Sequence, residues 1–245
     1  MKIMKVRIWQ HRKKHYIIRL MKKIILALAI FLPVVSFAQT VDLLWQGENY
    51  VHPFYKGLPL WSNQSEITFV AFIDEMDNIE NLSYTWLRND NVIGSSSGIG
   101  KNSISFLDTI FSKPISIEVE VYNENEEFLA SDSVTLVAQP PITLVYENSP
   151  LYGILFNREG VLGYNFENVG EEKVFTAFPF FFSAISKDSE NLSYIWGKTV
   201  SQNSSATYKA PDEISALSNI DVGIRNKEMF KQNSMNSFRV QFKKQ

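Results

Sequence analysis

The sequence contains no cysteine and only three histidines among its 245 residues. The missing thiols exclude disulfide frameworks, thiolate metal sites and cysteine nucleophiles. Two of the histidines, His11 and His15, lie in a basic N-terminal segment, so His52 is the single imidazole further along the chain. One histidine excludes a multi-histidine metal site and leaves few arrangements for general-base catalysis. We therefore expect no catalytic residue, no metal site and no cofactor.

A hydrophobic run long enough to cross a bilayer is also missing. Residues 24–35 form an apolar run that Pro33 interrupts, and a membrane-spanning helix needs about 20 such residues. This run follows a segment, residues 1–23, with nine Lys and Arg and no acid, and it ends in Ser36-Phe37-Ala38. That order predicts a secretory signal peptide over residues 1–38. A retained anchor is the alternative.

Without this leader the chain has little positive charge. The remaining residues hold 15 Lys and Arg against 26 Asp and Glu, a formal net charge of −11. Such a surface repels nucleic acid and anionic membranes. We expect an exported protein, periplasmic, cell-surface or extracellular, with no transmembrane helix after cleavage. Export without cysteine favours a bacterial source.

The sequence repeats itself at an offset near 100 residues. Asn81-Leu82-Ser83-Tyr84-Thr85-Trp86 returns as Asn191-Leu192-Ser193-Tyr194-Ile195-Trp196, and Phe69-Val70-Ala71-Phe72 returns as Phe175-Thr176-Ala177-Phe178. Pro53-Phe54-Tyr55 loosely matches Pro150-Leu151-Tyr152. Collinear matches at similar offsets, from 97 to 110 residues, indicate a duplicated unit of domain size.

Within each unit the hydrophobic period is two. Ile115, Ile117, Val119 and Val121 alternate with polar residues, which is typical of a half-buried strand, and turn-forming residues separate such runs. The sequence predicts an all-β chain with two tandem Ig-like antiparallel β-sandwiches. We place the first over residues 39–138, a proline-stiffened linker at residues 139–142 and the second over residues 143–245.

The Tyr84-Thr85-Trp86 and Tyr194-Ile195-Trp196 strings resemble the third strand of immunoglobulin-like and polycystic-kidney-disease-like (PKD) domains. In those domains a tryptophan fills the space between the sheets. The resemblance implies that Tyr84, Trp86, Tyr194 and Trp196 form the structural core. The region from Leu44-Trp45 to Gly57 and the tandem layout also resemble exported two-domain proteins of candidate-phylum bacteria, a resemblance that implies no particular activity.

Aromatic side chains are dense in the first segment after the predicted leader, where five fall within seventeen residues. The set comprises Trp45, Tyr50, Phe54, Tyr55 and Trp61. Such a set could bind a glycan or peptide, whereas Pro53 and Pro59 favour an edge segment whose rings pack inward. The apolar run at residues 178–182 is expected to pack in the core or between domains.

The sequence has few features that point to calcium binding or catalysis. The acidic loops at residues 74–78 and 124–127 offer oxygens to calcium but lack fixed ligand spacing, which favours solvated turns. His52 has no nucleophile motif nearby, and a carboxylate pair such as Asp108 and Glu118 would need a deep pocket.

These observations favour a non-enzymatic exported surface or envelope interaction or assembly module. The partner would be another envelope or extracellular protein, or a glycan. The alternative is a carbohydrate- or ligand-binding module that uses the aromatic residues from Trp45 to Trp61. Pairing of a partner strand with an open sheet edge is a further hypothesis.

Overall fold

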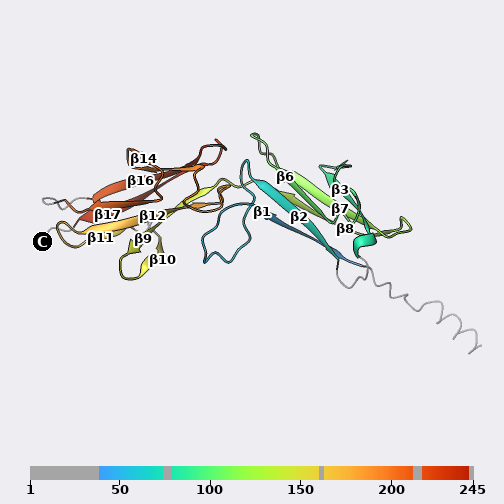
Figure 1. Ribbon diagram of the computed structural model, residues 1–245, viewed down its shortest axis with the longest axis horizontal. Coiled ribbons are helices and arrows are strands. Elements are labelled where there is room, and N and C mark those ends of the chain that lie inside the picture. Colours follow the sequence, from blue (N-terminus) through green and yellow to red (C-terminus); the bar gives the residue numbers. More distant parts are fainter. Residues whose placement is uncertain (1–38, 74–78, 160–162, 212–216, 243–245) are drawn as a thin grey trace, which may run out of the picture. The chain divides into compact units, whose positions relative to one another are not determined.

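The computed structural model describes residues 39–73, 79–159, 163–211 and 217–242 (Figure 1). The predicted signal peptide at residues 1–38 and the acidic loop at residues 74–78 lie outside these ranges. The described residues form strands and one short 3-10 helix, η1 (Ile79–Asn81). Within them, no helix is long and apolar enough to cross a bilayer.

Two antiparallel sheets make up the first sandwich. The three-stranded sheet has the order β1-β2-β6, with bounds β1 (Val41–Gly47), β2 (Glu66–Ile73) and β6 (Ser103–Leu107). The facing sheet has the order β4-β3-β7-β8, with β5 also on β3; its strands are β3 (Ser83–Arg88), β4 (Asn91–Val92), β5 (Gly98–Ile99), β7 (Ile115–Tyr122) and β8 (Phe128–Leu136). Every second residue of β7 is buried, as its period of two predicts.

The second sandwich repeats this plan. Its four-stranded sheet has the order β10-β9-β12-β15, with bounds β9 (Ile142–Ser149), β10 (Gly153–Glu159), β12 (Glu172–Phe180) and β15 (Ser205–Lys209). The other sheet has the order β11-β17-β16-β13-β14, with bounds β11 (Tyr164–Phe166), β13 (Leu192–Trp196), β14 (Thr199–Ser201), β16 (Leu217–Asn226) and β17 (Asn233–Phe242). Strand β11 pairs in parallel with β17, and the other pairs are antiparallel.

Each sandwich has its own hydrophobic core. The first core draws on residues between Val41 and Ala138, and the second on residues between Val145 and Val240. Tyr84 and Trp86 are buried in the first, and Tyr194 and Trp196 in the second. The prediction of an all-β chain of Ig-like sandwiches is thus confirmed, while the limits set for the linker and the two domains stay predictions.

The sequence repeat is also a repeat of hydrogen bonds. The indole Nε1 of Trp86 donates to the carbonyl of Lys101 at 2.8 Å, and that of Trp196 donates to the carbonyl of Asn203 at 3.3 Å. The backbone amide of Ala71 donates to Asn102 and that of Ala177 to Ser204, both at 2.8 Å. Strands β1, β2 and β3 therefore correspond to β9, β12 and β13.

Candidate functional site

The five aromatic residues proposed for binding do not share one surface. They lie on or beside the β1–β2 connection, residues 48–65. Trp61 is 1% exposed and belongs to the first core, and Trp45 packs against that core. Tyr50 and Tyr55 pack against a separate apolar cluster, and Phe54 is 68% exposed. The connection therefore has one ring in the first core, two rings against this separate cluster and one ring in solvent.

This separate cluster, called here the third cluster, lies on the outer face of the sheet β10-β9-β12. Its buried members are Tyr146, Phe178, Phe180 and Phe181. Alternation along β12 explains it: Phe175 and Ala177 face the second core, whereas Phe178 and Phe180 face the third cluster. Residues of the β1–β2 connection cover these rings. Both faces of β12 are thus covered, which explains why its side chains are apolar on both faces.

Backbone hydrogen bonds fix the connection to the end of β12. The amide of Tyr50 donates to the carbonyl of Phe182 at 2.8 Å, and the amide of Phe181 donates to the carbonyl of Tyr50 at 2.8 Å. The Ser62 hydroxyl donates to the carbonyl of Phe181 at 2.6 Å. Phe181 has a φ of 60°, a strained conformation for a bulky residue. Strain of this kind persists only where surrounding contacts fix it, and these bonds supply such contacts.

His52 lies among the rings of the third cluster. Its ring centroid is 4.8 Å from that of Phe180 and 5.0 Å from that of Phe156. Its Nδ1 accepts the backbone amide of Phe54 at 3.0 Å. Burial lowers the pKa of His52 below its ordinary value of 6.5, because charging the ring among apolar neighbours is unfavourable. These contacts make His52 a packing residue.

A polar hub lies beside the aromatic contacts. The buried Gln232 donates through Nε2 to the carbonyl of Asn63 at 2.9 Å and to the hydroxyl of Ser183 at 2.8 Å. Its Oε1 accepts the amide of Ser183 at 2.9 Å and Nδ2 of Asn226 at 3.0 Å. One amide side chain thus joins the β1–β2 connection to two segments of the second sandwich.

A hollow of about 860 Å³ borders this region. It is lined by residues 46–49, Pro59, residues 183–185, residues 189–191 and Glu228. Three of the lining side chains, Glu48, Glu190 and Glu228, are carboxylates. Asn49, also in the lining, donates through Nδ2 to the carbonyl of Leu60 at 2.5 Å.

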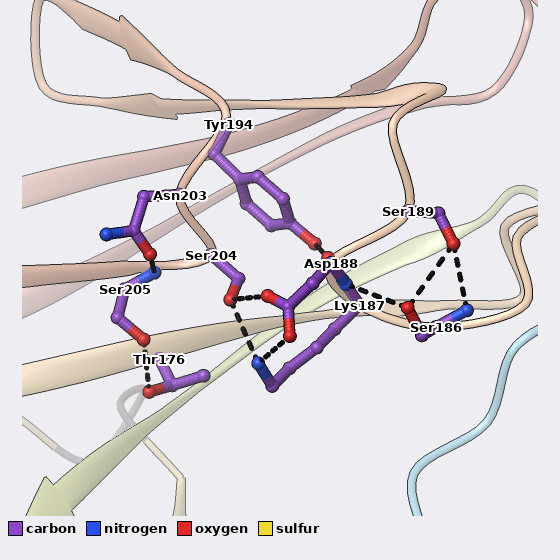
Figure 2. Close-up of polar contacts among 9 residues, drawn as sticks. All are labelled: Thr176, Ser186, Lys187, Asp188, Ser189, Tyr194, Asn203, Ser204 and Ser205. Atoms are coloured by element: carbon purple, nitrogen blue, oxygen red, sulfur yellow. Dashed lines mark hydrogen bonds and ion pairs between the residues drawn. The ribbon is translucent and has the colours of Figure 1, made fainter.

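Figure 2 shows a serine, a lysine and an aspartate close together in the second sandwich. The Ser204 hydroxyl donates to Asp188 at 2.6 Å, and Nζ of Lys187 lies 2.5 Å from the same carboxylate and 3.2 Å from Ser204. Desolvation raises the pKa of Asp188, but bonds from Lys187 and Ser204 outweigh it, and the net pKa is lowered. Ser204 is buried, so its hydroxyl is not accessible for nucleophilic attack.

The same network holds the loop before β13. The Tyr194 hydroxyl donates to the carbonyl of Lys187, and Ser189 accepts the amide of Ser186 at 2.9 Å. Burial, together with the charge of Asp188, raises the pKa of Tyr194. The cluster is therefore a loop support built from paired polar groups (Figure 2).

The remaining acidic candidates in the described residues lie in turns or loops, except Glu118, which lies on a strand. Asn123 Oδ1 accepts the amides of Asn125 and Glu127, both at 2.9 Å, and Glu124 accepts from Asn81 at 2.6 Å. Across the described ranges, no group of three His, Asp or Glu side chains is placed to hold a metal ion. Asp108 accepts the amide of Gln64 at 3.0 Å and the hydroxyl of Ser112. Glu118 lies on β7, where it pairs across the sheet with Ser133.

Comparisons with known proteins give distant similarities in structure. No family model matches the sequence, and no curated protein matches it. The N-terminal domains of the Highly Immunogenic Outer Capsid protein (Hoc) of bacteriophage RB49 are 13% identical, with a TM-score of 0.45, over 84% of this chain and 59% of that chain. The chain thus spans about three fifths of the phage chain.

Two further solved structures are similar at 10% identity. Fibronectin(III)-like modules of Clostridium thermocellum CbhA give a TM-score of 0.30, over 82% of this chain and 94% of theirs. SGBP-B of the Bacteroides ovatus mixed-linkage glucan utilization locus, solved with a mixed-linkage heptasaccharide, gives 0.26, over 83% of this chain and 47% of that chain. The resemblance to candidate-phylum proteins stays a prediction.

No pattern in the sequence indicates a role for Gln232, Ser62 or Asn226. Gln232 is 169 residues from Asn63 along the chain, so no local pattern indicates their contact. The nearest signal is the apolar run at residues 178–182, because a strand that is apolar on both faces needs a second covering layer.

Proposed function

We propose that this chain is an exported, non-enzymatic interaction or assembly module in which the β1–β2 connection keeps the two sandwiches together as one rigid body. The observation that carries this proposal is the double anchoring of the connection. Trp61 is buried in the first core, while Tyr50 exchanges backbone hydrogen bonds with Phe181 and Phe182. A rigid pair of sandwiches presents its surfaces in a fixed arrangement, which lowers the entropy lost when a partner binds.

The positions of the reactive groups support a non-enzymatic role. Catalysis needs a nucleophile and a base within reach of a substrate. The Ser204 hydroxyl is buried and bonded to Asp188, and the His52 ring is packed among aromatic rings. The Ser204 hydroxyl therefore supports a loop through hydrogen bonds, and the His52 ring packs in the third cluster.

The leader supports export, and the acidic charge of the remaining chain supports a partner other than nucleic acid. We expect another envelope or extracellular protein, or a glycan, as the partner. Exposed apolar side chains on β1 and β2, namely Leu44, Val70 and Phe72, are candidates for its contact surface.

Photo-crosslinking in the exporting cell tests this role. A photoreactive phenylalanine analogue replaces Phe72 on β2 in one strain and the exposed Val200 on β14 in a matched control. We expect the chain outside the cytoplasm, without residues 1–38, and covalent adducts from position 72 above those from position 200. Retention in the cytoplasm with the leader intact, or equal adducts from both positions, would contradict the proposal.

A second candidate is a carbohydrate-binding module. The exposed ring of Phe54 packs edge-on against Phe156 with centroids 5.0 Å apart, and an exposed aromatic ring can stack on a sugar. Affinity electrophoresis in soluble polysaccharides tests it. Retardation of the wild type that Phe54→Ala abolishes would support this candidate, and equal mobility of both proteins in every polysaccharide would remove it.

A further inference from the structure

Equivalent sheets of the two sandwiches differ in what covers their outer faces. Phe72 and Phe178 occupy equivalent positions on β2 and β12. Phe72 pairs across the sheet with Asp42, and Leu44 pairs with Val70. In the second sandwich Phe178 pairs with Leu144, and Thr176 pairs with Tyr146. The outer face of β1 and β2, carrying Leu44, Val70 and Phe72, therefore corresponds to the face of β9 and β12 under the third cluster.

Among the described residues, the face in the second sandwich is covered and its equivalent in the first is not. Phe178 is 2% exposed and Tyr146 is 6% exposed. The rings of His52 from the β1–β2 connection and Phe156 from β10 lie against both. Tyr50, Val51, Tyr55 and Leu60 of the connection pack against the same cluster. At the equivalent positions in the first sandwich, Phe72 is 51% exposed and Leu44 is 56% exposed. The first sandwich thus exposes apolar side chains at two positions whose equivalents are buried in the second, with Asp42 in the place of Leu144.

The covering segment also has an equivalent. The β1–β2 connection corresponds to the segment between β9 and β12, and Pro53-Phe54-Tyr55 matches Pro150-Leu151-Tyr152 in sequence. Leu151 and Tyr152 lie at the turn between β9 and β10 and are 84% and 80% exposed. The Ser149 hydroxyl accepts both of their amides, at 3.3 and 3.4 Å, and Gly153 has the positive φ of 70° that closes the turn. A defined turn therefore presents two apolar side chains to solvent.

Within the part of the chain that the structure describes, one apolar face and one apolar turn have no partner. The connection of the first sandwich occupies the face of the second, so the open face of β1 and β2 and the tip at Leu151 and Tyr152 remain. We propose that the tip of one copy binds the open face of another copy and repeats between molecules the contact seen within one. This inference rests on the proposed interaction role and names a second copy of this chain as the partner.

Such a contact joins different surfaces of the two copies. It is therefore heterologous, and it leads to a ring or to an open head-to-tail array. A contact formed by one turn and a small apolar face buries less area than a permanent interface, so we expect weak, concentration-dependent association.

Sedimentation velocity of the chain isolated after export tests the proposal. Phe72→Asp places a charge in the open face, and Tyr152→Asp places a charge at the tip. Val200→Asp is the control at an exposed apolar position elsewhere. We expect the weight-average sedimentation coefficient of wild type and Val200→Asp to rise with concentration, and each of the other variants to stay monomeric. All three substitutions change exposed side chains. Leu44→Asp and Leu151→Asp repeat the test if either first variant fails to fold.

Mixing the two monomeric variants distinguishes head-to-tail binding from other modes. Phe72→Asp keeps its tip and Tyr152→Asp keeps its face, so we expect the mixture to form 1:1 dimers and nothing larger. A wild type that is monomeric up to millimolar concentration, association that survives Tyr152→Asp, or a mixture that stays monomeric would overturn the proposal. In the crosslinking experiment, adducts with a different protein alone would overturn it while leaving the interaction role in place.

Discussion

At the residue scale, the described indole rings all lie in or against the two sandwich cores, a placement that can be measured. Trp61 comes from the aromatic set proposed for binding, yet it is as buried as Trp86. Its Nε1 has no hydrogen-bond partner among the described residues. Trp61 therefore stabilises the first sandwich through apolar contact, and its indole N–H subtracts from that stability.

Replacement of Trp61 by alanine should destabilise the first sandwich by about 3–5 kcal/mol, the range for a large core aromatic. Trp61→Phe should cost less, because it keeps an apolar ring and removes the unpaired N–H. Guanidinium unfolding followed by tryptophan fluorescence measures both. Phe54→Ala is the control and should stay within about 0.5 kcal/mol of wild type. A Trp61→Ala variant as stable as Phe54→Ala would contradict burial of this ring.

His52 predicts a pH dependence of the free energy of unfolding. Its pKa in the folded chain is below 6.5, so the unfolded chain takes up the proton first as the pH falls. The stabilisation is complete above about pH 6.5, declines as the pH falls toward the folded pKa, and declines no further below it. Denaturant midpoints between about pH 5 and 8 measure this, a range in which histidine is the side chain that ordinarily titrates.

His52→Asn is the matched variant for this measurement. Its Oδ1 can accept the Phe54 amide as Nδ1 does, but it does not titrate. The decline should therefore be absent from His52→Asn. A wild-type midpoint that is constant, or that rises on acidification through this range, would show that His52 is not shielded from water.

At the element scale, the β1–β2 connection gains its structure from distant partners. It has turns and irregular backbone, apart from one isolated bridge between Ser62 and Gln139. Its amide and carbonyl groups find partners in Phe181, Phe182 and the side chain of Gln232. Other backbone groups of the connection bond to Glu66 and Asp108 of the first sandwich and to Gln139. The connection is therefore ordered by contacts with both sandwiches.

Replacement of Gln232 by leucine should loosen this connection. The change leaves the half-buried Ser183 amide and Asn63 carbonyl without their partner, at up to about 1–3 kcal/mol for each group. Hydrogen exchange should accelerate at the amides of Tyr50 and Phe181. Gln241→Leu, at an exposed position on β17, is the control and should leave exchange unchanged. Unchanged exchange in Gln232→Leu would show that the hub does not hold the connection.

The strands were predictable from local pattern, whereas the connection was not. The alternation in β7 and the repeated Tyr-x-Trp string indicate strands and cores because side chains three or fewer residues apart carry that signal. Asn89 and Asp90 have positive φ in the turn between β3 and β4, as turn-formers of this kind favour. The contacts of Ser62 and Gln232 span more than 100 residues, and composition cannot reveal them.

At the scale of the whole chain, three apolar clusters organise the described residues. Two are the cores of the sandwiches, and the third cluster combines side chains from both sequence repeats. The sequence duplication gives two similar sandwiches. They differ because the β1–β2 connection covers the outer face of β9 and β12, whereas the equivalent face of β1 and β2 is exposed. This inequality underlies both the proposed interaction role and the proposed binding of a second copy.

Residual dipolar couplings of backbone amides test most directly whether the β1–β2 connection keeps the sandwiches together. In weakly aligned solution, couplings from β3 and β7 and from β13 and β16 give one alignment tensor for each sandwich. We expect a single tensor that fits both sets in the wild type, and two tensors of different magnitude in Gln232→Leu. Two different tensors in the wild type would show sandwiches that move independently and would contradict it.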